Sequence, residues 1–397
     1  MKKKLLSFGL LCIMVMILSG CSAAGGYYRS GKRCFLSGNF EEAAANFKAA
    51  ISQNPNKAIY YIDYGMTLIA LGQYEESIEQ FDKAYLDKDI IMVKENNKRS
   101  LRGKGIAYYQ MYRYHDAIQL FDEALQMRVL SELNMDILYY KGSSLMTIGF
   151  YEEARDIYTE FLNTFGDDPV ALCNRAYTFR KLGDQEASLI DYDKAISLNP
   201  KSYEGYFGKY YLLLDTGKEA EAKQVLEAAA AIEVKSKEDR FMQAKVHYYQ
   251  ERYDEALAEL SEAFANGFTE AYFYIGEIYR KKKDYETAIY YYDKYLDEGN
   301  ITTPFVYNQI ATSLMTTGEY KQAIKYLEKG MDYKHAGTMK ALKKNEIIAY
   351  ENLGLFETAI QKLKEYKASY PEDKEAEKEL DFITTRLMNP DDIKKGQ

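Results

Sequence analysis

The sequence has few of the side chains that bind metals or perform nucleophilic catalysis. Its 397 residues include three His, and His115, His247 and His335 have no Cys or carboxylate at the spacing of metal ligands. No Gly-rich phosphate loop, HExxH motif or Ser/His/Asp arrangement stands in a context that would suit it. We therefore expect neither catalytic residues nor a metal or cofactor, and the chain is not predicted to be an enzyme.

Positive charge is also in deficit. The chain carries 52 Lys and Arg against 60 Asp and Glu, which gives a formal net charge of −8 at pH 7. Proteins that bind nucleic acid concentrate basic residues to neutralise phosphate groups. An acidic chain without a basic block therefore predicts that nucleic acid is not a partner.

Long apolar runs are confined to the N-terminus. Three Lys follow Met1, residues 5–18 are apolar, and the sequence Leu-Ser-Gly-Cys ends at Cys21. The apolar run is too short for a comfortable membrane span and has the flanks of an export signal. Its end resembles a bacterial lipobox, which implies that residues 1–20 are a removed signal peptide and that Cys21 is lipidated. An ordinary signal cut after Ala24 and an uncleaved anchor are the alternatives.

Lipidation at Cys21 implies a lipoprotein anchored to the bacterial membrane on its extracytoplasmic side. Two acyl chains suffice for stable anchoring, and no second apolar run is long enough to cross a bilayer. Removing residues 1–20 takes away three Lys and lowers the net charge to about −11. In the linker at residues 21–26, the five residues after Cys21 reach at most about 17 Å. The first helix, expected near Tyr27, should therefore stay close to the lipid, and later repeats should project away from it.

Past this linker the chain repeats one pattern. In residues 38–55, GNFEEAAANFKAAISQNP, a small residue at Ala43 precedes a large one, Phe47, by four positions, and this pair returns every 32 to 40 residues. The small residues of the ten copies are Ala43, Ser77, Ala117, Ala154, Ser188, Ala222, Ala256, Ala288, Ala323 and Ala359. The large residues are Phe47, Phe81, Phe121, Tyr158, Tyr192, Leu226, Leu260, Tyr292, Leu327 and Leu363. The spacing predicts a helix with small residues on one face.

Two further columns accompany this helix. A small residue recurs upstream, where we expect two helix backbones to approach closely, at Gly31, Gly65, Gly105, Gly142, Ala176, Ala244, Gly276 and Ala311. Seven residues after this column, seven of the copies have a Gly, which suits the left-handed conformation that ends a helix. Tyr112, Glu251 and Lys283 replace that Gly in the other three copies. At those three turns the pattern lacks the residue that most readily ends a helix.

The pattern resembles the tetratricopeptide repeat, whose units are pairs of antiparallel helices. The resemblance implies an all-α, right-handed superhelical solenoid of about ten helix pairs over residues 27–373. An insertion at residues 85–97 lengthens the second copy, either as an extended helix or loop or as a hinge or binding loop. Residues 374–397 are expected to form a capping helix with a polar outer face, followed by a tail.

The repeat also places the remaining reactive side chains. Cys34 and Cys173 lie four copies apart, which is beyond the roughly 7 Å that a disulfide spans, so we expect free thiols. Asp191 and Asp193 flank Tyr192, which is a core position of the repeat. Both acids are therefore expected to face solvent.

In tetratricopeptide arrays the first helix of each pair lines a concave groove, so the resemblance implies a ligand surface. We call these helices the first helices and their partners the second helices. The groove positions of the middle copies are mostly aromatic, with two cations: Tyr139, Tyr177, Arg180, Phe207, Tyr211, Leu214, Phe241, Lys245, Tyr248, Tyr249 and Phe273. These side chains either bind a partner or pack against the next repeat. Aromatics from three successive repeats, among them Tyr177 and Phe241, are expected to converge on one patch.

The repeat accounts for nearly the whole mature chain and leaves no room for a catalytic domain. The favoured function is a membrane-anchored scaffold that binds a protein or peptide partner of the cell envelope. A glycan- or peptidoglycan-binding lipoprotein that uses the aromatic groove is the alternative, although the chain has no Trp. Chaperone-binding relatives use a clamp of Lys and Asn side chains to hold the free C-terminal carboxylate of a ligand. No three consecutive copies supply that clamp here.

Overall fold

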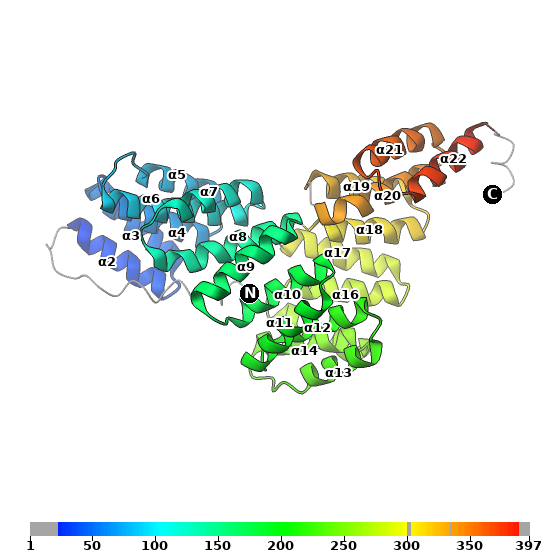
Figure 1. Ribbon diagram of the computed structural model, residues 1–397, viewed down its shortest axis with the longest axis horizontal. Coiled ribbons are helices and arrows are strands. Elements are labelled where there is room, and N and C mark those ends of the chain that lie inside the picture. Colours follow the sequence, from blue (N-terminus) through cyan, green and yellow to red (C-terminus); the bar gives the residue numbers. More distant parts are fainter. Residues whose placement is uncertain (1–22, 300–302, 334–335, 389–397) are drawn as a thin grey trace. The chain divides into compact units, whose positions relative to one another are not determined.

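A computed structural model gives the structure of residues 23–299, 303–333 and 336–388 (Figure 1). The predicted signal peptide and the predicted lipidation site, Cys21, lie outside the described residues. The chain divides after Pro200 into two compact units. Regular structure in the described residues is entirely helical, without a β-strand. The predicted all-α class is therefore confirmed.

In its described residues, the first unit has five helix pairs and one short 3-10 helix. In chain order these are α2 (Ala23–Leu36), α3 (Phe40–Gln53), α4 (Ala58–Ala70), α5 (Tyr74–Ala84), α6 (Ile91–Gln110), α7 (Tyr114–Gln126), η1 (Ser131–Leu133), α8 (Asn134–Ile148), α9 (Tyr151–Phe165), α10 (Pro169–Leu182) and α11 (Gln185–Leu198). Turns of two or three residues join the helices of each pair. Turns this short make paired helices antiparallel.

The described residues of the second unit form five further pairs and one single helix after them. In chain order these are α12 (Tyr203–Asp215), α13 (Glu219–Ala230), α14 (Lys237–Tyr249), α15 (Tyr253–Ala265), α16 (Glu270–Lys281), α17 (Tyr285–Gly299), α18 (Pro304–Thr316), α19 (Tyr320–Asp332), α20 (Ala336–Asn352), α21 (Phe356–Ser369) and α22 (Glu375–Met388). Helix α22 packs on α21 and buries Ala376 and Ile383.

The first helix begins earlier than the sequence indicated. Helix α2 starts at Ala23, four residues before the expected start near Tyr27. The reason is packing: Ala24 is 4% exposed and joins a small core with Ala50 and Tyr60. The predicted linker at residues 21–26 is therefore largely helical in the residues that the structure describes.

The predicted columns of small and large residues form the core of every pair. All ten small residues are fully buried, and the ten large residues are at most 3% exposed. The large rings also explain the glycines of the first helices. A Cβ atom on Gly65 would lie 2.8 Å from the ring of Phe81, and one on Gly142 would lie 2.8 Å from the ring of Tyr158. These glycines seat a ring from the paired helix, a more specific role than the close backbone approach that we expected.

The turns within pairs share one hydrogen-bond pattern. In the turn after α4, the Gly72 amide donates to the Ile69 carbonyl at 3.0 Å, and the next amide donates to the Leu68 carbonyl at 2.9 Å. Gly72 has a φ of +77°, which glycine adopts without strain. Where the repeat lacks this Gly, Tyr112, Glu251 and Lys283 take the same left-handed conformation, with φ of 61°, 60° and 64°. The turn therefore forms in the same way without its glycine.

The insertion forms an extended link and the start of a long first helix. Helix α6 has 20 residues, whereas α4 has 13. The Asn97 side chain accepts from the Leu86 amide at 3.0 Å and donates to the Leu86 carbonyl at 2.7 Å, which fastens the link to α6. Lys98 is 1% exposed, and its Nζ donates to the carbonyls of Met127 and Val129 and to the Asn134 side chain. Burial lowers the pKa of Lys98.

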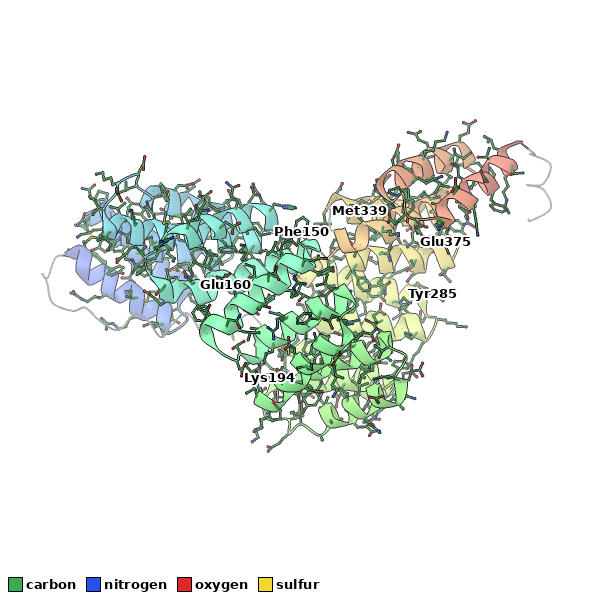
Figure 2. The ribbon with its side chains drawn as sticks, in the orientation of Figure 1. Phe150, Glu160, Lys194, Tyr285, Met339 and Glu375 are labelled. Carbon is green, nitrogen blue, oxygen red and sulfur yellow. The ribbon has the colours of Figure 1, made fainter. Side chains whose placement is uncertain are left out.

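Charged side chains such as Glu160 on α9 and Lys194 on α11 project from the second helices and are exposed (Figure 2). Within the described part of the chain, we find no helix that is both long and apolar enough to cross a bilayer.

Candidate binding site on the first helices

In the second unit, the predicted groove residues enclose a cation. The Nζ of Lys245, on α14, lies 5.6 Å from the ring centroid of Phe207, 5.5 Å from that of Phe241 and 5.0 Å from that of Tyr274. Cations are attracted to aromatic faces at these distances. Lys245 also donates to Glu270 at 3.1 Å, and its side chain is 13% exposed. Phe207 and Phe241 thus lie around one paired lysine of the chain itself.

The tyrosines of this cluster contact one another across neighbouring first helices. The Tyr211 hydroxyl, on α12, donates to the Tyr249 hydroxyl on α14 at 2.6 Å. The rings of Tyr248 and Phe273 each lie 5.3 Å from that of Tyr274 on α16. Burial raises the pKa of Tyr211, Tyr248 and Tyr249. These hydroxyls therefore stay protonated at neutral pH and act as hydrogen-bonding groups.

Tyr274, which is 6% exposed, is part of this cluster and was not predicted. It directly follows Phe273, and the sequence pattern assigned only Phe273 of this adjacent pair to the groove. A signal was present, because Tyr248-Tyr249 and Phe273-Tyr274 are adjacent aromatic pairs. Successive residues of a helix point about 100° apart, so both members of such a pair can contact the neighbouring first helices.

The predicted groove residues of the first unit are half-buried on α8 and α10. The ring of Tyr139 lies 6.5 Å from that of Tyr158, within the same helix pair. The ring of Tyr177 lies 6.3 Å from that of Tyr151 and 5.3 Å from the Nζ of Lys181. Burial raises the pKa of Tyr177 to about 12. Arg180 is half-buried one turn further along α10.

A buried carboxylate lies among the first helices of the second unit. Glu277 on α16 is 5% exposed and accepts from Arg280 at 2.8 Å and from Gln309, on α18, at 2.6 Å. Tyr292 of α17 also donates to it. A buried charge requires such partners because desolvation is costly. Glu277 thus ties three helices together, and sequence reasoning did not identify it.

A shallow hollow opens between the first helices α18 and α20. Its volume is about 280 Å³, and it is lined by Thr312, Met315, Thr316, Tyr320, Ile348 and Asn352. None of these side chains is charged. Typical small-molecule sites enclose roughly 300–1,000 Å³. An open hollow at the low end of that range, without a charged wall, suits uncharged side chains of a partner segment.

One expectation about acidic residues is wrong. Asp191 is 3% exposed, because Arg175 reaches it from α10 with hydrogen bonds of 2.7 and 2.9 Å. Asp193 does face solvent. His247 is also paired, with Glu259 at 2.6 Å. Among the described residues, no three His, Cys, Asp or Glu side chains gather as ligands for a metal ion.

The sequence is similar to known repeat proteins. Two sequence models of the tetratricopeptide repeat match, one at residues 37–90, 102–169 and 241–300 and the other at 169–202 and 306–334. Hsp70-Hsp90 organizing protein 2 of Arabidopsis thaliana is 26% identical over 211 residues, which cover 45% of this chain and 36% of that protein. Tetratricopeptide repeat protein 6 of Homo sapiens is 22% identical over 214 residues, which cover 53% of this chain and 40% of that protein. The match thus spans little more than a third of these relatives.

Solved structures are similar as well. A tetratricopeptide repeat protein from Parabacteroides merdae aligns with a TM-score of 0.44 and 19% identity, covering 64% of this chain and 98% of that chain. The structure of Pseudomonas aeruginosa pilF aligns with a TM-score of 0.45 and 18% identity, covering 56% and 97%. The repeat matches cover more than half of the chain, and the helix pairs are built on the same recurring columns. The chain belongs to the tetratricopeptide repeat family.

Proposed function

We propose that this protein is a non-enzymatic scaffold that binds segments of protein partners along its first helices. The observation that carries the proposal is the uncharged hollow between α18 and α20. It lies between two first helices, beside the start of α19, and it is open and uncharged. Similarity to Hsp70-Hsp90 organizing proteins supports protein segments as the class of ligand.

Glycans are a weaker proposal for this surface. A sugar-binding site needs aromatic faces on which a sugar ring can stack. In the second unit the rings of Phe207 and Tyr249 lie 5.3 Å apart, and those of Phe241 and Phe268 lie 5.2 Å apart. These faces are covered by neighbouring rings, and we therefore propose protein partners alone.

A pair of matched isoleucines tests the hollow. Ile348 lines it and is 43% exposed, whereas Ile190 is 60% exposed on the second helix α11. With a partner segment isolated by pull-down, Ile348→Asp should weaken binding roughly 30-fold, which is about 2 kcal/mol. Ile190→Asp should bind as the wild type does. Equal affinities of both variants in calorimetric titration would exclude the hollow as the site.

We further propose that lipid on Cys21 holds the scaffold at the extracytoplasmic face of a bacterial membrane, which makes cell-envelope proteins its partners. The proposal is supported by the lipobox-like sequence at the end of the apolar run. Cys21→Ser should release the protein from the membrane fraction or leave it unprocessed. A variant that is cut at the same place and still partitions with the membrane would contradict lipidation.

A further inference from the structure

The first unit exposes an apolar tip at the insertion. We define this apolar tip as Ile90, Ile91 and Met92, which are 55%, 70% and 68% exposed. Tyr85 and Leu86 in the same link are 41% and 44% exposed. Five large apolar side chains within eight residues thus meet solvent. Leaving them in water is unfavourable, by about 25 cal/mol for each Å² of apolar surface.

The tip is held rigidly and stands beyond the neighbouring helices. Helix α6 begins 14 residues before Gly105, whereas α2 begins eight residues before the equivalent Gly31. Six additional helical residues extend α6 by about 9 Å. The hydrogen bonds of Asn97 to Leu86 and the three hydrogen bonds from the buried Lys98 fix the base of this extension.

The tip and the start of α2 lie at the same edge of the first unit. Successive helices are antiparallel, so the first helices α2, α4 and α6 run in the same direction and begin at one edge. Helix α2 contacts α4, and α4 contacts α6. At roughly 10 Å per helix, the starts of α2 and α6 are about 20 Å apart. Cys21 stands two residues before the start of α2.

The residues around the tip suit the surface of a bilayer. Lys88 and Lys94 flank the three apolar residues, next to the acids Asp87, Asp89 and Glu95, and Lys94 forms an ion pair with Asp89. Lysine side chains beside an apolar segment keep their ammonium groups at the lipid headgroups while the apolar residues enter the acyl region. A protein partner could also cover an apolar tip. The position of the tip beside the predicted lipid attachment favours the bilayer.

We propose that the apolar tip inserts into the lipid bilayer that holds the N-terminal anchor. This inference rests on the proposed lipidation of Cys21. The lipid alone fixes one point of the protein and leaves it free to swivel. The tip supplies a second point of contact about 20 Å away, and two points leave the first unit only rotation about the line that joins them.

The experiment compares two labelled sites in the lipidated full-length protein. In a chain with Cys34→Ala and Cys173→Ala, Ile91→Cys carries an environment-sensitive fluorophore, and Leu36→Cys carries it in the control. Leu36 is 58% exposed at the end of α2, at the opposite edge of the same unit. In phosphatidylethanolamine and phosphatidylglycerol vesicles, the label at position 91 should shift to shorter wavelength and be quenched by doxyl lipids. The label at position 36 should show neither effect.

The two proposals fail in different ways. Mass spectrometry of the N-terminal peptide shows directly whether Cys21 carries lipid. If it does and the label at position 91 emits as in water, the apolar tip does not enter the bilayer and the inference is overturned. If Cys21 carries no lipid, anchoring is refuted. Quenching at position 91 of that unlipidated chain on the same vesicles would then support insertion of the apolar tip without a lipid anchor. Lack of quenching would overturn the insertion.

Discussion

Three turns between paired helices place a side chain where the other turns have glycine. Tyr112, Glu251 and Lys283 have φ near +60°, and the Lys283 amide donates to the Arg280 carbonyl at 3.0 Å as in the glycine turns. An L-residue in this conformation crowds its Cβ against the backbone, at a cost of roughly 1–2 kcal/mol. The hydrogen bonds of the turn and the packing of the two helices outweigh this cost.

Replacing one of these residues by glycine should stabilise the protein. Lys283 is exposed, so Lys283→Gly removes little besides the strained Cβ. We expect the free energy of unfolding to rise because this strain is removed. The rise should be no more than about 1 kcal/mol, because glycine gains entropy in the unfolded chain and this opposes the gain. Gly72→Ala, at φ +77°, should lower it by a similar amount. A urea midpoint that falls for Lys283→Gly would show that the side chain contributes a favourable contact.

A carboxyl group beneath the last helix makes stability depend on pH. Burial and the neighbouring Glu379 of α22 raise the pKa of Glu351 from 4.5 to about 7, and Arg386 opposes the shift. A raised pKa means that the folded state favours the protonated form. The stability that this proton contributes is complete below pH 4.5 and is lost as the pH rises through about 7.

Glu351→Gln tests this dependence, because Gln keeps the shape and stays neutral. The wild type and the variant should have similar denaturation midpoints at pH 4, and the variant should be more stable at pH 8. Hydrogen exchange in α22 should slow in the variant at pH 8 only. If the difference between the two proteins does not change with pH, Glu351 is already ionised in the fold.

At the scale of the helix, small residues decide how closely a pair can pack. Ala256 on α15 is fully buried, whereas Ala258 on the same helix is exposed. Ala256→Leu should overpack the pair and lower the free energy of unfolding by roughly 1–3 kcal/mol. Ala258→Leu should change it by no more than about 0.5 kcal/mol. A thermal melt in which both variants match the wild type would contradict the repeat register.

The buried columns could be predicted because a repeat copies one local burial pattern ten times. Ala256 and Phe81 stand out in such a pattern without knowledge of the fold. The burial of Asp191 could not be predicted, since it depends on Arg175 of another helix and no periodicity marks that pair. The setting of Lys245 among aromatic rings likewise requires the geometry of successive first helices. Lipidation of Cys21 stays a prediction.

At the scale of the whole molecule, each helix contacts mainly its neighbours along the chain. Stability in such arrays is a sum of local terms, so a local change acts locally. The ring of Phe81 lies between Gly65 of α4 and Gly103 of α6 and therefore joins two pairs of the first unit. Damage there should affect the first unit before the second.

Phe81→Ala should separate the unfolding of the two units. Loss of this fully buried ring costs about 3–5 kcal/mol. Hydrogen exchange in rising urea should then show helices α4 to α6 opening while residues 201–388 stay protected. Leu327→Ala, in the second unit, should reverse the order. Simultaneous loss of protection throughout both variants would mean that the chain unfolds as one cooperative block.

A stack of pairs that contact mainly their neighbours also bears mechanical load in series. When a partner pulls on one end, every pair along the line of force feels the same tension, and the small extensions of the pairs add together. The part of each unit that the structure describes forms five pairs, so it behaves as five springs end to end, more compliant than any single pair. The protein can therefore lengthen under load while each pair keeps its buried ring, and the weakest pair sets the force at which unfolding begins.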